Sequence, residues 1–149
     1  MGSTYYSLHV HVVFATKDRR ALIAPDWMTR LHEYLGGCAR TADAVAEEVG
    51  GIEDHVHMLM GIRTTHRISD LMREIKSASS LWFHEEIGER FFGWQDGYGA
   101  FSVSRSNVDS VRRYIRNQRE HHRTRSFDDE LRAFLAAHGI VPGPAVRRP

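Results

Sequence analysis

The sequence is poor in the features of secreted and membrane proteins. It has a single cysteine, Cys38, which excludes an internal disulfide and agrees with a reducing cytoplasm. No segment approaches the ~20 apolar residues that a membrane-spanning helix needs. The N-terminus shows no basic start followed by an apolar run and a small-residue cleavage site, so we expect no secretory signal. We therefore expect a soluble cytoplasmic protein without a membrane partner.

Proline is also scarce, and three of the four prolines lie in the last nine residues. We expect residues 141–149 to form a disordered tail and residues 1–140 to form one domain, because a chain of 149 residues has the size of a single core. Hydrophobic residues make up 42% of the chain and charged residues 26%, which is ordinary for a soluble globular protein.

The net charge of +1 hides a local excess of arginine. Between Arg112 and Arg125 there are six arginines and one acid, Glu120. Such a stretch is either a phosphate-binding surface or one solvated face of a helix, and composition alone does not choose between the two.

Two histidines stand out in the segment from Glu53 to Met60. Side chains of a strand alternate between its faces, so His55 and His57 point to one side while Val56 and Met58 point to the other. The apolar side can pack on a core, and we expect the histidine side to be open. Two imidazoles at this spacing can hold one divalent metal ion.

A second pair with the same spacing weakens that interpretation. His9 and His11 alternate with Val10 and Val12 near the N-terminus. For either pair, exposed or structurally hydrogen-bonded imidazoles are the simpler alternative to a metal site.

Hydrophobic periodicity and turn residues predict the order of the elements. The expected elements are a strand at about 4–15, a helix at 25–41, strands at 45–52 and 53–60, a helix at 68–88, a strand at 98–104, and helices beginning at 106 and 126. Residues 50–51 are expected as a turn or bulge, and capping boxes are expected at 106–109 and 126–129. The order is that of an α+β, ferredoxin-like split β-α-β antiparallel sheet with helices on one face, followed by C-terminal helices.

The helix that begins at residue 106 carries a second candidate pair. Tyr114 and Gln118 are four residues apart and therefore lie on the same side of a helix. A glutamine oxygen can bind Mg²⁺ or Mn²⁺, and a tyrosine oxygen can act as a nucleophile. A half-buried structural tyrosine is the alternative for Tyr114, and Tyr98, between two glycines, is the main competing nucleophile.

In their order and spacing these segments resemble the single-tyrosine HUH transposases of bacterial insertion sequences and their relatives associated with repetitive extragenic palindromes. The resemblance covers about residues 5–140. It rests on His11-Val12-Val13-Phe14 with Lys17, Asp54-His55-Val56-His57-Met58, Lys76 with Ser79-Ser80, the segment 94–104, and Tyr114-Ile115-Arg116-Asn117-Gln118 followed by His121-His122.

The resemblance implies a metal-dependent endonuclease and strand transferase that acts on single-stranded DNA with hairpins. It implies that His55, His57 and Gln118 bind Mg²⁺ or Mn²⁺ and that Tyr114 forms a 5′-phosphotyrosine intermediate. It also implies a homodimer, in which Tyr114 serves either its own subunit or the partner. By charge and position, the candidate DNA-binding residues are Arg19, Arg20, Lys76, Arg112, Arg113 and Arg116.

Three other functions remain open from the sequence. The first is a resident nuclease of the same family that processes palindromic repeats and moves no element of its own. The second is a catalytically silent nucleic-acid-binding module, although sheets of that kind usually present stacking aromatic residues. The third is a metal hydrolase that uses histidine-bound water, for which an additional ligand or an acidic base near the pair is expected.

Overall fold

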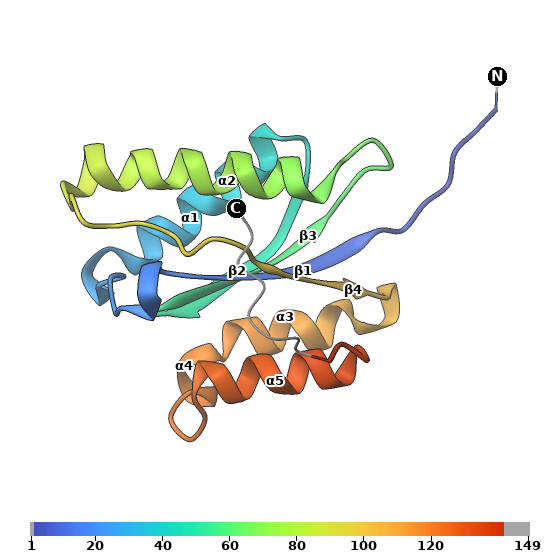
Figure 1. Ribbon diagram of the computed structural model, residues 1–149. Coiled ribbons are helices and arrows are strands. Elements are labelled where there is room, and N and C mark those ends of the chain that lie inside the picture. Colours follow the sequence, from blue (N-terminus) through green and yellow to red (C-terminus); the bar gives the residue numbers. More distant parts are fainter. Residues whose placement is uncertain (1, 142–149) are drawn as a thin grey trace.

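The computed structural model describes residues 2–141, which form a four-stranded antiparallel sheet with helices on both faces (Figure 1). The strand order is β2-β3-β1-β4. The strands are β1 (His9–Ala15), β2 (Val45–Ile52), β3 (His55–Gly61) and β4 (Gly99–Val103). The helices are α1 (Pro25–Thr41), α2 (Ile68–Trp82), α3 (Val108–Arg116), α4 (Gln118–His121) and α5 (Phe127–Ala137). The predicted α+β fold and the order of its elements are confirmed.

The main core lies between the sheet and the pair α1 and α2. Alternate residues of the central strands, among them Phe14 and Met58, are fully buried against Leu31 and Leu35 of α1 and Ile75 of α2. Each such side chain contributes roughly 1.5–3 kcal/mol when it leaves water. Hydrophobic burial therefore decides which face of each strand meets these helices.

The helix boundaries follow local sequence signals. Pro25 occupies the first turn of α1, where its missing N–H costs nothing. After Trp82 the predicted second helix continues as a π-helical turn, Phe83–Ile87, and ends at Gly88 in the left-handed region (φ 77°). Within residues 2–141 we find no helix that combines the length and the apolar character needed to cross a bilayer.

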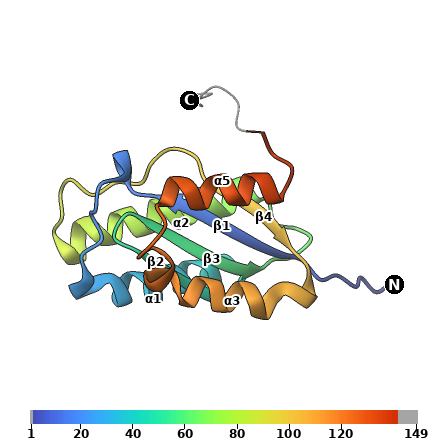
Figure 2. The same cartoon turned by 90° about the horizontal axis from the view of Figure 1, so that it is seen from below.

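The opposite face of the sheet is covered by α3, α4 and α5 (Figure 2). The expectation that the histidine face is open is therefore wrong. The reason is that Val108 and Ile115 of α3 form a second apolar cluster with Leu59 of β3, and Phe134 of α5 packs on the aromatic side chains of the same face. These apolar groups would otherwise be exposed to water.

Several expected boundaries shift. The first strand begins at His9, not near residue 4. Gly50 and Gly51 lie inside β2, and the turn to β3 is made by Glu53 and Asp54. Of the two capping boxes, Ser126 accepts a hydrogen bond from the backbone N–H of Asp129 as expected. The box at 106–109 is wrong, because a 3-10 turn (Arg105–Asn107) precedes α3 and no side chain caps it.

Gly50 has a steric role in this arrangement. A Cβ at this position would stand 2.5 Å from the backbone oxygen of Ile115 on α3. The absence of a side chain lets α3 lie directly on β2. The expected disordered tail remains a prediction, since residues 142–149 lie outside the described part of the chain.

Candidate active site

His55 and His57 enter the site from β3 and are each oriented by a second group. Asp54 Oδ1 accepts a hydrogen bond from His55 Nδ1 at 2.7 Å. His57 Nδ1 lies 2.8 Å from His11 Nε2 on the neighbouring strand β1. With both Nδ1 atoms engaged, both Nε2 atoms are left to face the interior between the sheet and α5, as in metal sites whose ligands are fixed by outer partners.

Tyr114 and Gln118 reach the same region from the C-terminal helices. The expectation that one continuous helix carries both is wrong, because α3 ends at Arg116 and α4 begins at Gln118. The break keeps both side chains on the sheet side, and Gln118 Oε1 lies 3.0 Å from His55 Nε2. The predicted meeting of the histidines with Tyr114 and Gln118 is realised within one chain.

The centre of the site is the carboxylate of Glu130 from α5, which is 1% exposed. Its Oε1 accepts a hydrogen bond from His57 Nε2 at 2.9 Å and lies 3.4 Å from His55 Nε2. One carboxylate oxygen therefore occupies the point on which the histidine pair converges.

The second oxygen of Glu130 binds the nucleophile candidate. Oε2 accepts hydrogen bonds from the Tyr114 hydroxyl, from Gln118 Nε2 (3.1 Å) and from His122 Nε2 (3.1 Å). The Glu130 carboxylate therefore lies between the Tyr114 hydroxyl and the two histidines.

Two of the expected ligand atoms are spaced as a divalent cation requires. Mg²⁺ and ions like it bind at about 2.1 Å in octahedral geometry, which places neighbouring ligand atoms about 3 Å apart. His55 Nε2 and Gln118 Oε1, two of the three expected ligand atoms, are 3.0 Å apart. A glutamine oxygen suits Mg²⁺ or Mn²⁺, and imidazole nitrogens also bind zinc, iron and nickel. The residues present therefore fit such an ion.

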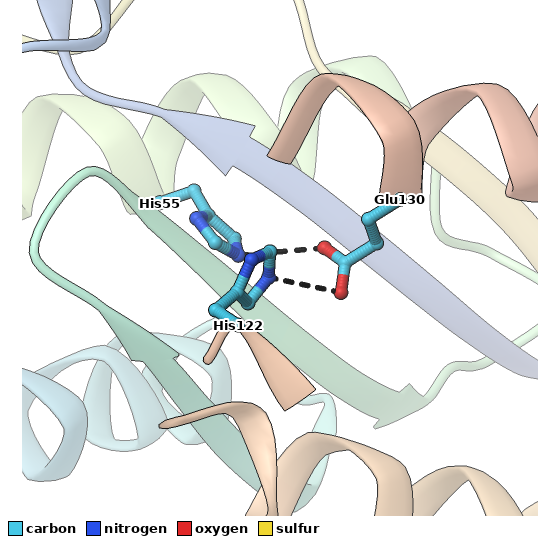
Figure 3. A group of neighbouring side chains, drawn as sticks. All are labelled: His55, His122 and Glu130. Atoms are coloured by element: carbon cyan, nitrogen blue, oxygen red, sulfur yellow. Dashed lines mark hydrogen bonds and ion pairs between the residues drawn. The ribbon is translucent and has the colours of Figure 1, made fainter. Parts of the chain in front are cut away.

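A second possible ligand set shares His55 with the first. Ligand atoms of His55, His122 and Glu130 all lie within 4.8 Å of one another (Figure 3). In Figure 3 the two imidazoles, from β3 and from the segment after α4, point at the carboxylate from α5.

The pKa values of the histidines diverge because their partners differ. Burial lowers the pKa of His55, but its hydrogen bonds to Asp54 and Glu130 outweigh burial and raise that pKa to about 9. Burial dominates at His57 and lowers its pKa to about 4 despite Glu130. Burial would raise the pKa of the Glu130 carboxyl, yet hydrogen bonds from His55 and His57 hold it well below its usual range. The site therefore favours positive charge beside Glu130.

The same carboxylate suppresses ionisation of Tyr114. Burial and the negative charge of Glu130 raise the pKa of the Tyr114 phenol well above its ordinary value. In this arrangement the phenol is a weak nucleophile. A cation at the histidines or removal of the carboxylate would increase its acidity.

Helix α5 covers the whole cluster. The Phe127 ring stacks on His55 with centroids 4.3 Å apart, and Phe134 meets His11 edge-on at 5.0 Å. Arg19 forms an ion pair with Asp128 and lies 5.2 Å from the Phe127 ring centroid. Because His55 and His57 are fully buried, no DNA strand can reach them in this arrangement.

The structure places the histidines of the N-terminal pair differently, one outside the site and one inside it. His9 lies at the far end of β1, opposite Gly61, whereas His11 belongs to the cluster through His57. The ring centroid of Tyr98, the competing nucleophile, lies 5.9 Å from Nζ of Lys76. Lys76 belongs to α2, which packs on the other face of the sheet. Both observations favour His55, His57 and Tyr114 as the central residues.

Most candidate DNA-binding residues have partners within the chain. Arg19 pairs with Asp128, Arg112 with Glu47, and Arg116 with Glu48, while Lys76 Nζ donates to the backbone oxygens of Gln95 (2.7 Å) and Gly97 (2.6 Å). Arg20 and Arg113 are exposed. The DNA-binding role of all six remains a prediction.

Sequence reasoning missed Glu130 and did not assign a role to His122. Glu130 carries a recognisable signal, since it stands between Phe127 and Phe134 at helical spacing, on the side of α5 that packs inward. An acid in the apolar stripe of a helix requires a buried partner. Here the partners are the histidines and Tyr114.

The chain is similar to known transposases in sequence. The model of a family described as IS200-like transposases matches residues 4–118. The transposase of insertion sequence IS200 from Salmonella typhimurium (strain LT2) is 27% identical over 126 residues, which are 80% of this chain and 82% of that protein. The ISDra2 transposase TnpA of Deinococcus radiodurans is 22% identical over 121 residues, 77% of this chain and 86% of that protein.

Two solved structures share the fold. A putative transposase from Deinococcus radiodurans has a TM-score of 0.65 at 25% identity and covers 79% of this chain and 96% of its own. A REP-associated tyrosine transposase bound to a REP hairpin has a TM-score of 0.60 at 14% identity and covers 100% of this chain and 94% of its own.

Proposed function

This chain belongs to the IS200-like transposase family, and on that premise we propose that it cleaves and rejoins single-stranded DNA that carries hairpins. The observation that supports this most directly is the convergence on one carboxylate, Glu130, of the Tyr114 hydroxyl and the two Nε2 atoms of His55 and His57. In the reaction a phosphodiester would take the place of that carboxylate, since each group presents two oxygens that share one negative charge.

His55, His57 and Gln118 would hold the divalent ion, Mg²⁺ or Mn²⁺. When bound, such an ion supplies Lewis acidity and orientation to the phosphate. Asp54 and His11 keep the two imidazoles oriented through their Nδ1 atoms. Displacement of α5 would remove Glu130 and open the site to the strand.

Tyr114 would then act as the nucleophile. Its oxygen forms a bond to phosphorus as the bond between phosphorus and the 3′ oxygen breaks. The phenolic proton passes to solvent or to a nearby base, and the departing 3′ oxygen takes up a proton from solvent. The products are a 5′-phosphotyrosine and a free 3′-hydroxyl. Because the phosphotyrosine conserves the energy of the phosphodiester, a different 3′-hydroxyl can attack it and restore the DNA chain.

The test is to incubate the protein with labelled, hairpin-bearing single strands and Mn²⁺ or Mg²⁺. We expect a covalent protein–DNA adduct that is lost in Tyr114→Phe and in the presence of a chelator, and that is retained in the control Tyr98→Phe. An adduct formed by Tyr114→Phe would refute the assignment of the nucleophile.

Two related functions are separated by the same assay. Glu130 is the kind of acidic group that hydrolysis by histidine-bound water would use, and cleavage without a protein-linked product would favour that reaction. Binding that is insensitive to chelator, with no cleavage of any strand, would favour a silent binding module.

A resident enzyme that processes palindromic repeats is the second candidate within the family. It is favoured by the structural neighbour bound to a REP hairpin, which aligns with 100% of this chain. Tighter binding to palindromic hairpins than to single strands of equal length would support it, measured by gel shift at fixed salt.

We also propose that the protein is a homodimer, as the family resemblance suggests. The chain brings Tyr114 to its own histidines, so the geometry supports use of the tyrosine within one subunit. Mixing Tyr114→Phe with His57→Ala subunits tests this, because restored adduct formation would require exchange of the tyrosine between subunits. Light scattering gives the oligomeric state directly.

A further inference from the structure

Three arginines on α3 and α4 form ion pairs with carboxylates on or beside β2. Arg112, Arg116 and Arg119 are spaced by four and three residues and so follow one side of the helical segment. The pairs are Arg112 with Glu47, Arg116 Nη2 with Glu48 Oε1 at 2.9 Å, and Arg119 Nη2 with Glu53 Oε1 at 3.0 Å. We call these three pairs the arginine ladder.

A bulge in β2 makes the ladder possible. Ala46 pairs with Met60 and Glu48 pairs with Leu59, so the register shifts by one residue at Glu47. Successive strand residues normally point to opposite faces, and without the shift Glu48 would face the main core. With it, both Glu47 and Glu48 reach arginines of α3.

The ladder joins α3 to the sheet at a place where few apolar side chains are buried between them. The apolar cluster beneath α3 has three fully buried members, Leu59, Val108 and Ile115. Such a cluster holds a helix on a sheet but specifies its position along the strand weakly. The three acids are partly shielded, with side-chain exposures of 25% for Glu47, 19% for Glu48 and 31% for Glu53. A shift of α3 along its axis by half a turn, about 2.7 Å, would separate every pair, and a shift by a full turn, about 5.4 Å, would leave the pair at one end unmade.

We propose that Glu47, Glu48 and Glu53 are positioning residues that set the register of the nucleophile helix over the histidine pair of the same chain. This inference rests on the proposed function, since it assigns the ladder to the placement of Tyr114 and Gln118. The ladder also neutralises Arg112 and Arg116, so their charges serve alignment of the helix before any contact with phosphate.

The acids are the informative residues to change, because arginine variants would also lose any contact with DNA. In the variant Glu47→Gln, Glu48→Gln, Glu53→Gln the arginines remain and are freed. Each exposed or half-exposed pair changes a rate by up to about fivefold, so three pairs together give up to about 100-fold. We expect adduct formation at saturating DNA to slow by roughly 10- to 100-fold, while DNA affinity is unchanged or tighter.

A matched control is Glu120→Gln, which removes an exposed acid paired with Arg123 on the same helical segment, without contact to the sheet. It should leave the adduct rate and the DNA affinity as in the wild type. The charge swap Glu48→Arg with Arg116→Glu should recover at least half of the loss seen in Glu48→Arg alone. A structural role unrelated to this pair would give no recovery.

Hydrogen exchange supplies a readout that does not depend on activity. In the triple variant, amides of residues 108–121 should exchange at least about tenfold faster, while those of α1 stay unchanged. Unchanged exchange in α3 and α4, or a triple variant that forms adduct at the wild-type rate, would overturn the proposal. A wild-type protein that forms no adduct would refute the proposed function, and exchange in α3 would still decide the role of the ladder.

Discussion

The Tyr114 hydroxyl donates its hydrogen bond to the Glu130 carboxylate, so the candidate nucleophile and an acid from α5 are joined in the buried centre of the site. The two residues come from different helices and are 16 positions apart. The same carboxylate contacts His57, which makes it the link between the candidate nucleophile and the candidate metal-binding residues. Its charge therefore affects both halves of the site.

Glu130→Gln should accelerate adduct formation, by about 3- to 10-fold, because it removes the negative charge that raises the pKa of the Tyr114 phenol. The pKa of Tyr114 should fall, as measured by ultraviolet difference titration against Tyr114→Phe. Loss of charge-assisted hydrogen bonds to His57 and its neighbours should lower the free energy of unfolding by roughly 1–3 kcal/mol. A tenfold slower adduct rate would instead make Glu130 a required ligand or base.

Metal binding should depend on the histidines of β3. We expect His55→Ala to weaken Mn²⁺ binding by at least about 100-fold, measured by electron paramagnetic resonance of free Mn²⁺, because second-shell changes alone usually cost 10- to 100-fold. The control is His9→Ala, which removes an imidazole of the same spacing pattern at the far end of β1. Equal weakening by both variants would exclude a specific site at His55.

Gly50→Ala should displace α3. The added Cβ would meet the backbone oxygen of Ile115 at 2.5 Å, and a backbone atom cannot rotate away. We expect a loss of roughly 1–3 kcal/mol in the free energy of unfolding and a slower adduct rate. In the control Gly37→Ala the new Cβ lies 3.7 Å from an arginine side chain in α1, where alanine should be tolerated or stabilising by about 0.5–1 kcal/mol. Chemical denaturation measures both.

The free energy of unfolding should decrease as the pH falls, and His32 should be one cause. Burial lowers the pKa of His32 to about 4, and its Nε2 finds no hydrogen-bond partner among the described residues. Since the unfolded value is near 6.5, protons bind the unfolded chain more tightly, and this contribution to stability is complete above pH 6.5 and is lost as pH falls toward 4.

His32→Leu should therefore flatten the pH dependence of the unfolding free energy between pH 6.5 and 4. The difference between wild type and variant should reach about 3 kcal/mol over this range, at 1.36 kcal/mol per pKa unit. Other buried histidines contribute equally to both proteins and cancel in the comparison. Parallel pH profiles would show that His32 does not carry this sensitivity.

Local patterns in the sequence were sufficient for the elements and for part of the site. Alternation of polar and apolar residues located β3 and the facing of His55 and His57, and helical spacing located Tyr114 near Gln118. These predictions succeed because periodicity is a property of neighbouring residues. The resemblance to a known family chose between two histidine pairs that spacing left equal.

Tertiary contacts decided what covers the histidines and what lies at their centre. Glu130, His11 and His122 join the site through packing between elements distant in sequence, and the arginine-rich stretch is engaged by acids on β2 that a bulge turns toward it. No fixed spacing along the sequence identifies the residues that make these contacts, so local patterns could not predict them. By itself, the sequence determined which faces carry polar groups, and the folded chain decided which of those groups meet, because burial of the apolar sides of α3 and α5 brings their polar residues onto the sheet.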